Sequence, residues 1–208
     1  MSLFTLIPAD RFLVFLGSAI VLNLTPGADV LFATACGLGG GPRAGAAAGL
    51  GTAIGSLWHA GLSAIGLSAL LIAYPPALAA LRGAGAAYLL WLAWQSWRAA
   101  RRGPGAARAE ALAPGAALRR AMTINATNPK VALFMLAFLP QFTSPARGPV
   151  WQQILLLGLT VTFTGGVITA AYGTVAGVLG TSLATRMSAL NRIAAAMLCF
   201  LALRLLWG

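Results

Sequence analysis

The stretch NATNPKVALF, residues 125–134, places an Asn-Pro pair and the chain's only lysine inside a segment that is otherwise apolar enough for a membrane. Asparagine is a preferred N-cap residue, and proline is favoured at the first position of a helix. The residue before a proline also avoids helical backbone angles. The pattern therefore predicts that one helix ends before Asn128 and that another begins at Pro129, within the membrane.

The composition around this stretch is typical of an integral membrane protein. Of the 208 residues, 59% are hydrophobic and 8% are charged, whereas about 25% of the residues in a soluble domain are charged. The net charge of +11 does not indicate nucleic acid binding, because the arginines lie mainly between apolar runs rather than in a basic domain. We predict an all-α integral membrane protein that binds no nucleic acid and spans the lipid bilayer several times.

Apolar runs and the breakers between them predict six transmembrane helices in one membrane domain. A spanning helix needs about 20 mostly apolar residues. The predicted spans are 11–36, 43–72, 75–98, 121–140, 151–180 and 186–206. The first of them lacks a basic leader and contains polar residues, so we interpret it as a retained helix rather than a signal peptide.

The first span contains a second candidate break, at Thr25-Pro26. Threonine is also an N-cap residue, so this pair matches Asn128-Pro129 of the fourth span. Three spans separate the two breaks, so spans one and four run in opposite directions and their new helix N-termini point toward each other. We therefore predict two inverted three-helix repeats, in which spans one and four are discontinuous helices broken at Pro26 and Pro129.

The repeats are predicted to cover residues 1–98 and 121–208, with a basic loop over 99–120 between them. Arginine marks cytoplasmic loops by the positive-inside rule. The side with the 99–120 loop carries Arg43, Arg98, Arg101, Arg102, Arg108, Arg119, Arg120, Arg186 and Arg192, and the other side carries Arg11, Arg82, Arg147 and Arg204. The 99–120 loop is therefore predicted to be cytoplasmic, with both termini outside.

The two breaks predict a binding site for a small solute near the middle of the membrane. Irregular backbone is tolerated at that depth where it lines a cavity, and a helix N-terminus offers free N–H donors and a partial positive charge to a carboxylate. The predicted substrate-binding residues are Asn23, Thr25, Pro26, Gly27, Asp29, Asn125, Asn128, Pro129 and Lys130.

Ionisable residues within the spans predict proton coupling. Charges inside a membrane are costly and are usually functional. Asp29 is the only acid within a predicted span, and Lys130 follows Pro129 directly. We expect Asp29 and Lys130 to pair or to alternate, with Asp29 carrying the proton; a static salt bridge is the alternative. His59 could relay protons or could be a hydrogen-bonded packing residue.

Glycines recur at four-residue spacing, and such rows let helices approach closely. They lie at Gly37, Gly41, Gly45 and Gly49, at Gly51 and Gly55, and at Gly173 and Gly177. We interpret them as packing faces within one bundle, with a homodimer interface as the alternative.

The chain lacks the residues that several other activities need. The chain has no Gly-x-x-x-x-Gly-Lys-Ser/Thr nucleotide motif, and Cys36 and Cys199 make no metal-ligand spacing. Ser56 and His59 are one helical turn apart, which is a weak indication of a hydrolase. We expect no enzyme activity, no bound metal and no cofactor.

Motifs across the whole chain resemble the LysE/RhtB family of amino acid exporters. They are Pro26-Gly27-Ala28-Asp29, Gly85-Ala86-Ala87-Tyr88-Leu89, Asn128-Pro129-Lys130, Phe134 and Leu139-Pro140-Gln141-Phe142. The resemblance implies export of amino acids or their derivatives across the bacterial inner membrane, driven by the proton gradient. Such a transporter is a secondary exporter, with an amino acid and protons as its partners.

Two positions depart from the family pattern. Ala28 stands where the family commonly has a second proline, and Ser56 stands near the position of an acid in many members. The scarcity of acids favours a neutral substrate over lysine or arginine. The alternatives are a membrane thiol–disulfide carrier, which would use Cys36 and Cys199, and a metal ion exporter of related architecture.

Overall fold

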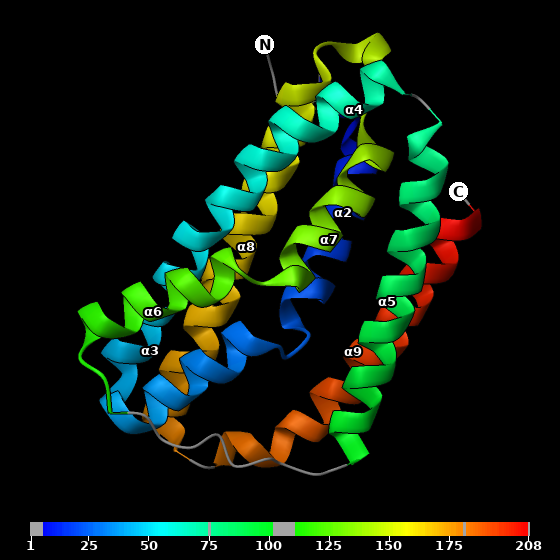
Figure 1. Ribbon diagram of the computed structural model, residues 1–208. Helices are drawn as coiled ribbons and strands as arrows, with labels where there is room; N and C mark the ends of the chain where they lie inside the picture. Colours follow the sequence, from blue (N-terminus) through cyan, green and yellow to red (C-terminus); the bar gives the residue numbers. More distant parts are fainter. Residues whose placement is uncertain (1–5, 75, 102–110, 181, 208) are drawn as a thin grey trace.

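The computed structural model describes residues 6–74, 76–101, 111–180 and 182–207, and over these ranges its regular elements are all helical (Figure 1). The helices are α2 (Ala9–Leu24), α3 (Ala28–Leu62), α4 (Ser68–Ala73), α5 (Ala77–Arg101), α6 (Pro114–Ala126), α7 (Pro129–Phe138), α8 (Val150–Leu179) and α9 (Ser182–Trp207). A π-helical turn, η1 (Ser63–Leu67), joins α3 to α4, and two 3₁₀ turns, η2 (Leu139–Phe142) and η3 (Pro145–Arg147), lie between α7 and α8. The all-α prediction is confirmed.

Helix α3 changes direction at Gly41, where the sequence predicts a turn between the first two spans. Gly41 has a φ of 81° and ψ of 177°, a backbone conformation that glycine adopts without the steric cost of a Cβ atom. Pro42 follows at once and begins the next helical segment. Figure 1 shows α3 descending to this turn and then rising toward α4.

The outside of the bundle is covered by large apolar side chains. Ile65 is 76% exposed, Phe163 is 71% exposed and Phe200 is 64% exposed. Soluble proteins rarely expose large contiguous apolar patches, whereas lipid is a suitable solvent for them. The helical segments Ala28–Leu70 and Val150–Leu179 are also long and apolar enough to cross a membrane.

The helices form pairs that enclose the two interrupted segments. Helix α3 packs along α8 and α6, and α5 packs along α9. Figure 1 shows α2 and α7 between these groups. Phe15 of α2, Phe134 of α7 and Leu157 of α8 are fully buried in one apolar core, so the ends of α2 and α7 are held inside the protein.

The predicted glycine rows pack helices within the bundle. A Cβ atom added to Gly45 would overlap the backbone of Gly173, and one added to Gly49 would overlap Ala170. On the other side of α3, a Cβ atom at Gly51 would overlap the Leu118 carbonyl of α6. Close backbone approach therefore fixes α3 against both α8 and α6, as predicted for intramolecular packing.

The predicted loop 99–120 is too long. Helix α5 continues to Arg101. Helix α6 begins at Pro114, so the fourth span starts seven residues earlier than the predicted residue 121. The prediction followed apolar runs, but alanine and arginine are strong helix formers even where hydropathy is low. Residues 102–110 lie outside the described residues, with Arg102, Arg108 and Glu110 among them, as do 1–5 and Pro75.

Replacing Gly45 by alanine is expected to destabilise the protein, because the new Cβ atom meets backbone that cannot move aside. Overpacking costs about 1–3 kcal/mol or more. Gly61→Ala in the same helix is the matched control, since no atom lies within 4 Å of its added Cβ. Thermal unfolding in detergent should show a lower midpoint for Gly45→Ala only. Equal midpoints for the two variants would contradict the close α3–α8 contact.

Candidate functional site

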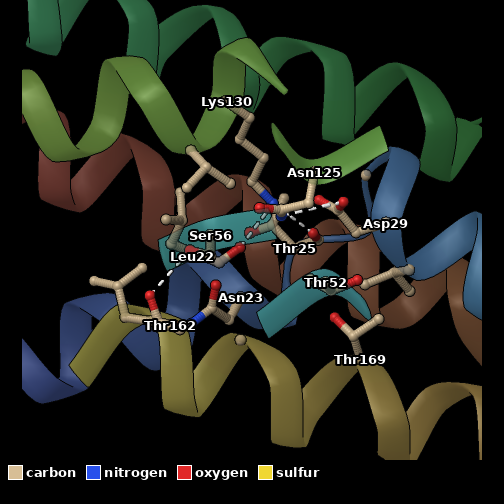
Figure 2. Close-up of a pocket in the computed structure, with 15 residues that line it drawn as sticks. Leu22, Asn23, Thr25, Asp29, Thr52, Ser56, Asn125, Lys130, Thr162 and Thr169 are labelled. Carbon is tan, nitrogen blue, oxygen red and sulfur yellow. Dashed lines mark hydrogen bonds between the residues drawn. The ribbon is translucent and has the colours of Figure 1, made fainter. Parts of the chain in front are cut away.

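Two interruptions of the helices come together in the middle of the bundle. Helix α2 ends at Leu24 and α3 begins at Ala28, while α6 ends at Ala126 and α7 begins at Pro129. Side-chain hydrogen bonds connect the two interruptions directly. Figure 2 shows the residues that surround the cavity between them. We refer to Thr25–Gly27 as the first break and to Thr127–Asn128 as the second break.

The second break has the geometry that the sequence predicts. Asn128 is the N-cap of α7, and its Oδ1 accepts a hydrogen bond of 2.9 Å from the Lys130 backbone N–H. Pro129 occupies the first turn, where the absence of an N–H leaves no donor unpaired. The prediction that a helix restarts at Asn128-Pro129 is confirmed.

The first break differs from the prediction that Thr25 caps a helix beginning at Pro26. Thr25 instead ends α2, because its hydroxyl donates a hydrogen bond of 2.8 Å to the Val21 carbonyl one turn earlier. Pro26 lies within the break, and Gly27 precedes α3 without a side-chain cap. The hydroxyl of a threonine before a proline can bond to the preceding helix or to the following one, and here it bonds to the preceding helix.

Lys130 crosses from α7 to the end of α2. Its Nζ donates to the carbonyl of Leu22 at 2.8 Å and to the carbonyl of Thr25 at 2.7 Å. The last carbonyls of a helix lack partners and carry a partial negative charge, so they favour a cation. Tyr172 of α8 donates its hydroxyl to a third carbonyl there, that of Leu24, at 3.2 Å. The interrupted end of α2 is thus capped by side chains from α7 and α8.

Asp29 lies in the first turn of α3 and faces the second break. Its Oδ1 accepts a hydrogen bond of 3.2 Å from the Asn125 amide, and its Oδ2 accepts one from the Asn128 amide. Among the hydrogen bonds of the described residues, Asp29 and Lys130 thus have separate partners. The expectation that the two residues pair or alternate stays a prediction, and both line one cavity.

The cavity collects six of the residues predicted to bind substrate. They are Asn23, Thr25, Gly27, Asp29, Asn125 and Lys130. Asn128, Pro26 and Pro129 shape the breaks but are not among the lining residues. The interior measures about 20 Å³ for the centre of a water molecule, which is room for roughly one water. The space inside is therefore smaller than an amino acid.

His59 stands behind the cavity rather than in its lining. Its Nε2 lies 2.9 Å from the backbone carbonyl of Asn125. A carbonyl can only accept, so this nitrogen must carry the hydrogen. The contact binds α3 to the C-terminal end of α6, and it matches the packing role that the sequence leaves open for this residue.

Four hydroxyl-bearing residues of the cavity wall are absent from the predicted site. Thr52 and Ser56 come from α3, and Thr162 and Thr169 come from α8. Thr162 donates its hydroxyl to Ser56 at 3.2 Å. Their spacing of four residues in α3 and seven in α8 puts each pair on one helix face. Hydroxyl residues at helical spacing inside apolar spans are the signal that could have identified them.

The sequence was compared with those of known proteins and protein families. Residues 20–208 match the model of the LysE type translocator family. An uncharacterized membrane protein of Vibrio cholerae is 36% identical over 81% of this chain and 82% of its own. The homoserine/homoserine lactone efflux protein of Salmonella typhi is 35% identical over 78% of each chain. The leucine efflux protein of Enterobacter sp. is 30% identical over 73% of this chain and 72% of its own. No solved structure matches significantly.

Removing the Lys130 ammonium should destabilise the fold, because the Thr25 carbonyl loses its side-chain donor and the Leu22 carbonyl keeps only the Thr25 backbone N–H, at 3.2 Å. Leaving a buried acceptor unpaired costs about 1–3 kcal/mol. Lys130→Met is therefore expected to lower the thermal midpoint in detergent more than Tyr172→Phe, which removes only the single bond to Leu24. A Lys130→Met protein as stable as the wild type would show that this cap is not needed.

Proposed function

The chain belongs to the LysE type translocator family of bacterial membrane proteins, and we propose that it exports an amino acid or an amino acid derivative from the cytoplasm. Family membership makes it a transport protein rather than an enzyme. The observation that carries the proposal is Asp29, bound by Asn125 and Asn128 between two broken helices in the interior of a membrane protein.

The two breaks provide backbone groups that can bind a substrate. Unpaired backbone groups are costly in the membrane and are tolerated where they line a cavity. The first turns of α3 and α7 supply N–H donors and a partial positive charge, and discontinuous helices present such ends to anionic substrate groups in other transporters. The substrate carboxylate is held by these two helix N-termini near the membrane midplane.

The relatives' names narrow the class of substrate. Homoserine, its lactone and leucine share an α-amino group and a side chain without charge. The cavity wall agrees with a neutral substrate, because Ser56 and Thr162 bond to each other there and Asp29 is the one acid among its lining residues. A neutral amino acid or a derivative of one is therefore the exported compound.

Transport is coupled to protons by the carboxyl group of Asp29. Export that opposes the concentration gradient needs a second ion, and Asp29 is the acid inside the spans that can take up and release one proton per cycle. Lys130 supports the exchange from the same cavity, and His59 of α3 lies behind the cavity, where it bonds to Asn125 of α6. Protonation weakens the hold of Asp29 on the two asparagines and frees the cavity to open.

Two inverted three-helix repeats account for alternating access. In Figure 1 the chain descends through α2 and the first part of α3, and it ascends through α6 and α7. The rising part of α3 pairs with α8, and α5 pairs with α9, so equivalent helices of residues 1–98 and 121–208 would meet across a pseudo-two-fold axis. Rocking of one repeat against the other opens the cavity to each side in turn.

The cytoplasmic face is the end that contains the Gly41 turn, the last turn of α5 and the start of α6. Arg43, Arg98 and Arg119 belong to this end, and the excess of arginine there follows the positive-inside rule. Both termini then face the periplasm. The protein lies in the bacterial inner membrane, and the connection from α5 to α6 is cytoplasmic.

The two alternatives from the sequence have less support. Cys36 is buried and Cys199 is exposed, and the two are not joined in a disulfide. Within the described ranges, no group of three or more His, Cys, Asp or Glu side chains could hold a metal ion. A thiol–disulfide carrier or a metal exporter would need such groups to meet.

Efflux from proteoliposomes tests the proposal. Vesicles are loaded with labelled leucine, homoserine or lysine, and efflux is measured with and without a pH gradient. Wild type should export leucine or homoserine faster with the gradient, and should not prefer lysine. Asp29→Asn should lose the stimulation by the gradient, because asparagine cannot carry the proton, and the exchange that remains should be the same with and without the gradient.

Asp10→Asn is the matched control, since Asp10 is exposed at the start of α2. It should keep gradient-driven efflux. No efflux of any amino acid by the wild type would contradict the transport proposal. Full coupling in Asp29→Asn would leave export standing but would exclude Asp29 as the proton carrier.

A further inference from the structure

Two buried side-chain oxygens in the cavity wall have no hydrogen-bond partner. They are Oδ1 of Asn125 and Oγ1 of Thr52, in residues that are 1% and 5% exposed. Buried polar atoms nearly always have partners, and an unpaired one costs about 1–3 kcal/mol. Both residues line the cavity that also contains Asp29, so the wall of this cavity has two acceptors without a donor as well as a carboxylate.

The orientation of the Asn125 side chain follows from its neighbour. A carboxylate only accepts hydrogen bonds, so the amide nitrogen of Asn125 must face Asp29, as the 3.2 Å contact shows. The side-chain oxygen of Asn125, which can only accept, is then left without a donor. The backbone of Asn125 is fixed as well, because His59 binds its carbonyl at 2.9 Å. The unpaired oxygen is thus held in place by partners on either side.

Thr52 differs from other threonines in the membrane helices. The hydroxyls of Thr34, Thr160 and Thr164 donate to the carbonyl four residues earlier in their own helices, at 2.7 to 2.9 Å. Thr52 makes no such bond, and its hydroxyl stays unpaired in the cavity wall. The neighbouring Gly51 and Gly55 bring α3 into backbone contact with α6, which carries Asn125.

We propose that Asp29, Oδ1 of Asn125 and Oγ1 of Thr52 form a subsite for the α-ammonium group of the substrate. An ammonium group has three N–H donors, and these three side chains offer three acceptors around one small space. The subsite rests on the proposed export function and specifies which end of the substrate it recognises. Figure 2 shows Asp29, Asn125 and Thr52 among the residues around the cavity.

The nearby Lys130 ammonium does not already occupy this subsite. The carbonyls of Leu22 and Thr25 bind it at the end of α2. Its three donors therefore point largely toward the first break rather than to Asn125 and Thr52. The cavity has room for a group about the size of a water molecule, and an ammonium group is of that size. The rest of the substrate needs the opened cavity.

The subsite has a consequence for specificity. Recognition depends on a free amine, so N-acylated amino acids are rejected because they have one N–H and no charge. Esters and lactones keep the ammonium group and are accepted, although they lose the contact between a carboxylate and the two helix N-termini. A site that rejects compounds lacking a hydrogen-bonding group does so strongly, because its own buried polar atoms would stay unpaired.

Ligand stabilisation of the detergent-purified, full-length protein against heat tests the subsite, and it avoids the leakage of esters through vesicles. The probes are leucine and homoserine, each as the free amino acid, the methyl ester and the N-acetyl derivative. In the wild type, the free amino acid and the ester should raise the unfolding temperature, and the N-acetyl derivative should not. Thr52→Val should weaken binding of the amino acid and the ester about tenfold or more.

Thr34→Val is the matched control, because it removes a buried hydroxyl of the same helix that bonds to its own backbone outside the cavity. It should bind both amine-bearing probes as the wild type does. Asn125→Leu should weaken binding like Thr52→Val, and it serves as the second variant if Thr52→Val does not fold.

Three outcomes would overturn the subsite. Binding of the N-acetyl derivative as tight as that of the amino acid would mean that the ammonium group is not recognised. Binding of the N-acetyl derivative but not of the ester would mean that the carboxylate, and not the ammonium group, is the recognised end. Unchanged binding by Thr52→Val and Asn125→Leu would mean that water alone fills the position. In each case amino acid efflux by the wild type would still support export, whereas its absence would contradict export itself.

Discussion

The hydrogen bonds from the Asn125 and Asn128 amides to the Asp29 carboxylate are the interaction on which the site depends. Each interrupted helix leaves unpaired backbone groups and end charges within the membrane, where their cost is several kcal/mol. Here side chains cross between the two breaks. Asp29 joins the start of α3 to the second break, and Lys130 joins the start of α7 to the end of α2. The two breaks are thus joined by hydrogen bonds in both directions.

These hydrogen bonds between the two breaks explain what the sequence could predict. The second break follows from Asn128 and Pro129 alone, because cap and proline act on adjacent residues. The position of the first break also follows from the sequence, but the helix to which Thr25 bonds does not, because its hydroxyl can donate to a carbonyl or accept from an N–H. The partners of Lys130 could not be predicted, because Leu22 and Thr25 are more than 100 residues away in the chain and offer only backbone atoms.

The hydroxyl residues of the cavity were missed for a related reason. A single serine or threonine in an apolar span bonds readily to its own helix, so Thr52 and Ser56 resemble Thr34 in the sequence. Their exposure to a cavity depends on how α3 lies against α6 and α8, which the glycines of α3 determine by close contact. The glycine rows predict packing faces. Which residues then line the cavity depends on the helices that lie against these faces, and the sequence does not identify those helices.

Access to the cavity from both sides of the membrane tests the central claim most directly. A cysteine is introduced at Ser56, which lines the cavity, in a chain whose Cys36 and Cys199 are replaced by alanine. A membrane-impermeant thiol reagent is then applied to either face of sealed vesicles. Labelling from each face, with protection by the transported amino acid, is the predicted result. Labelling from neither face, or from both without protection by any amino acid, would contradict an alternating-access site between the two breaks.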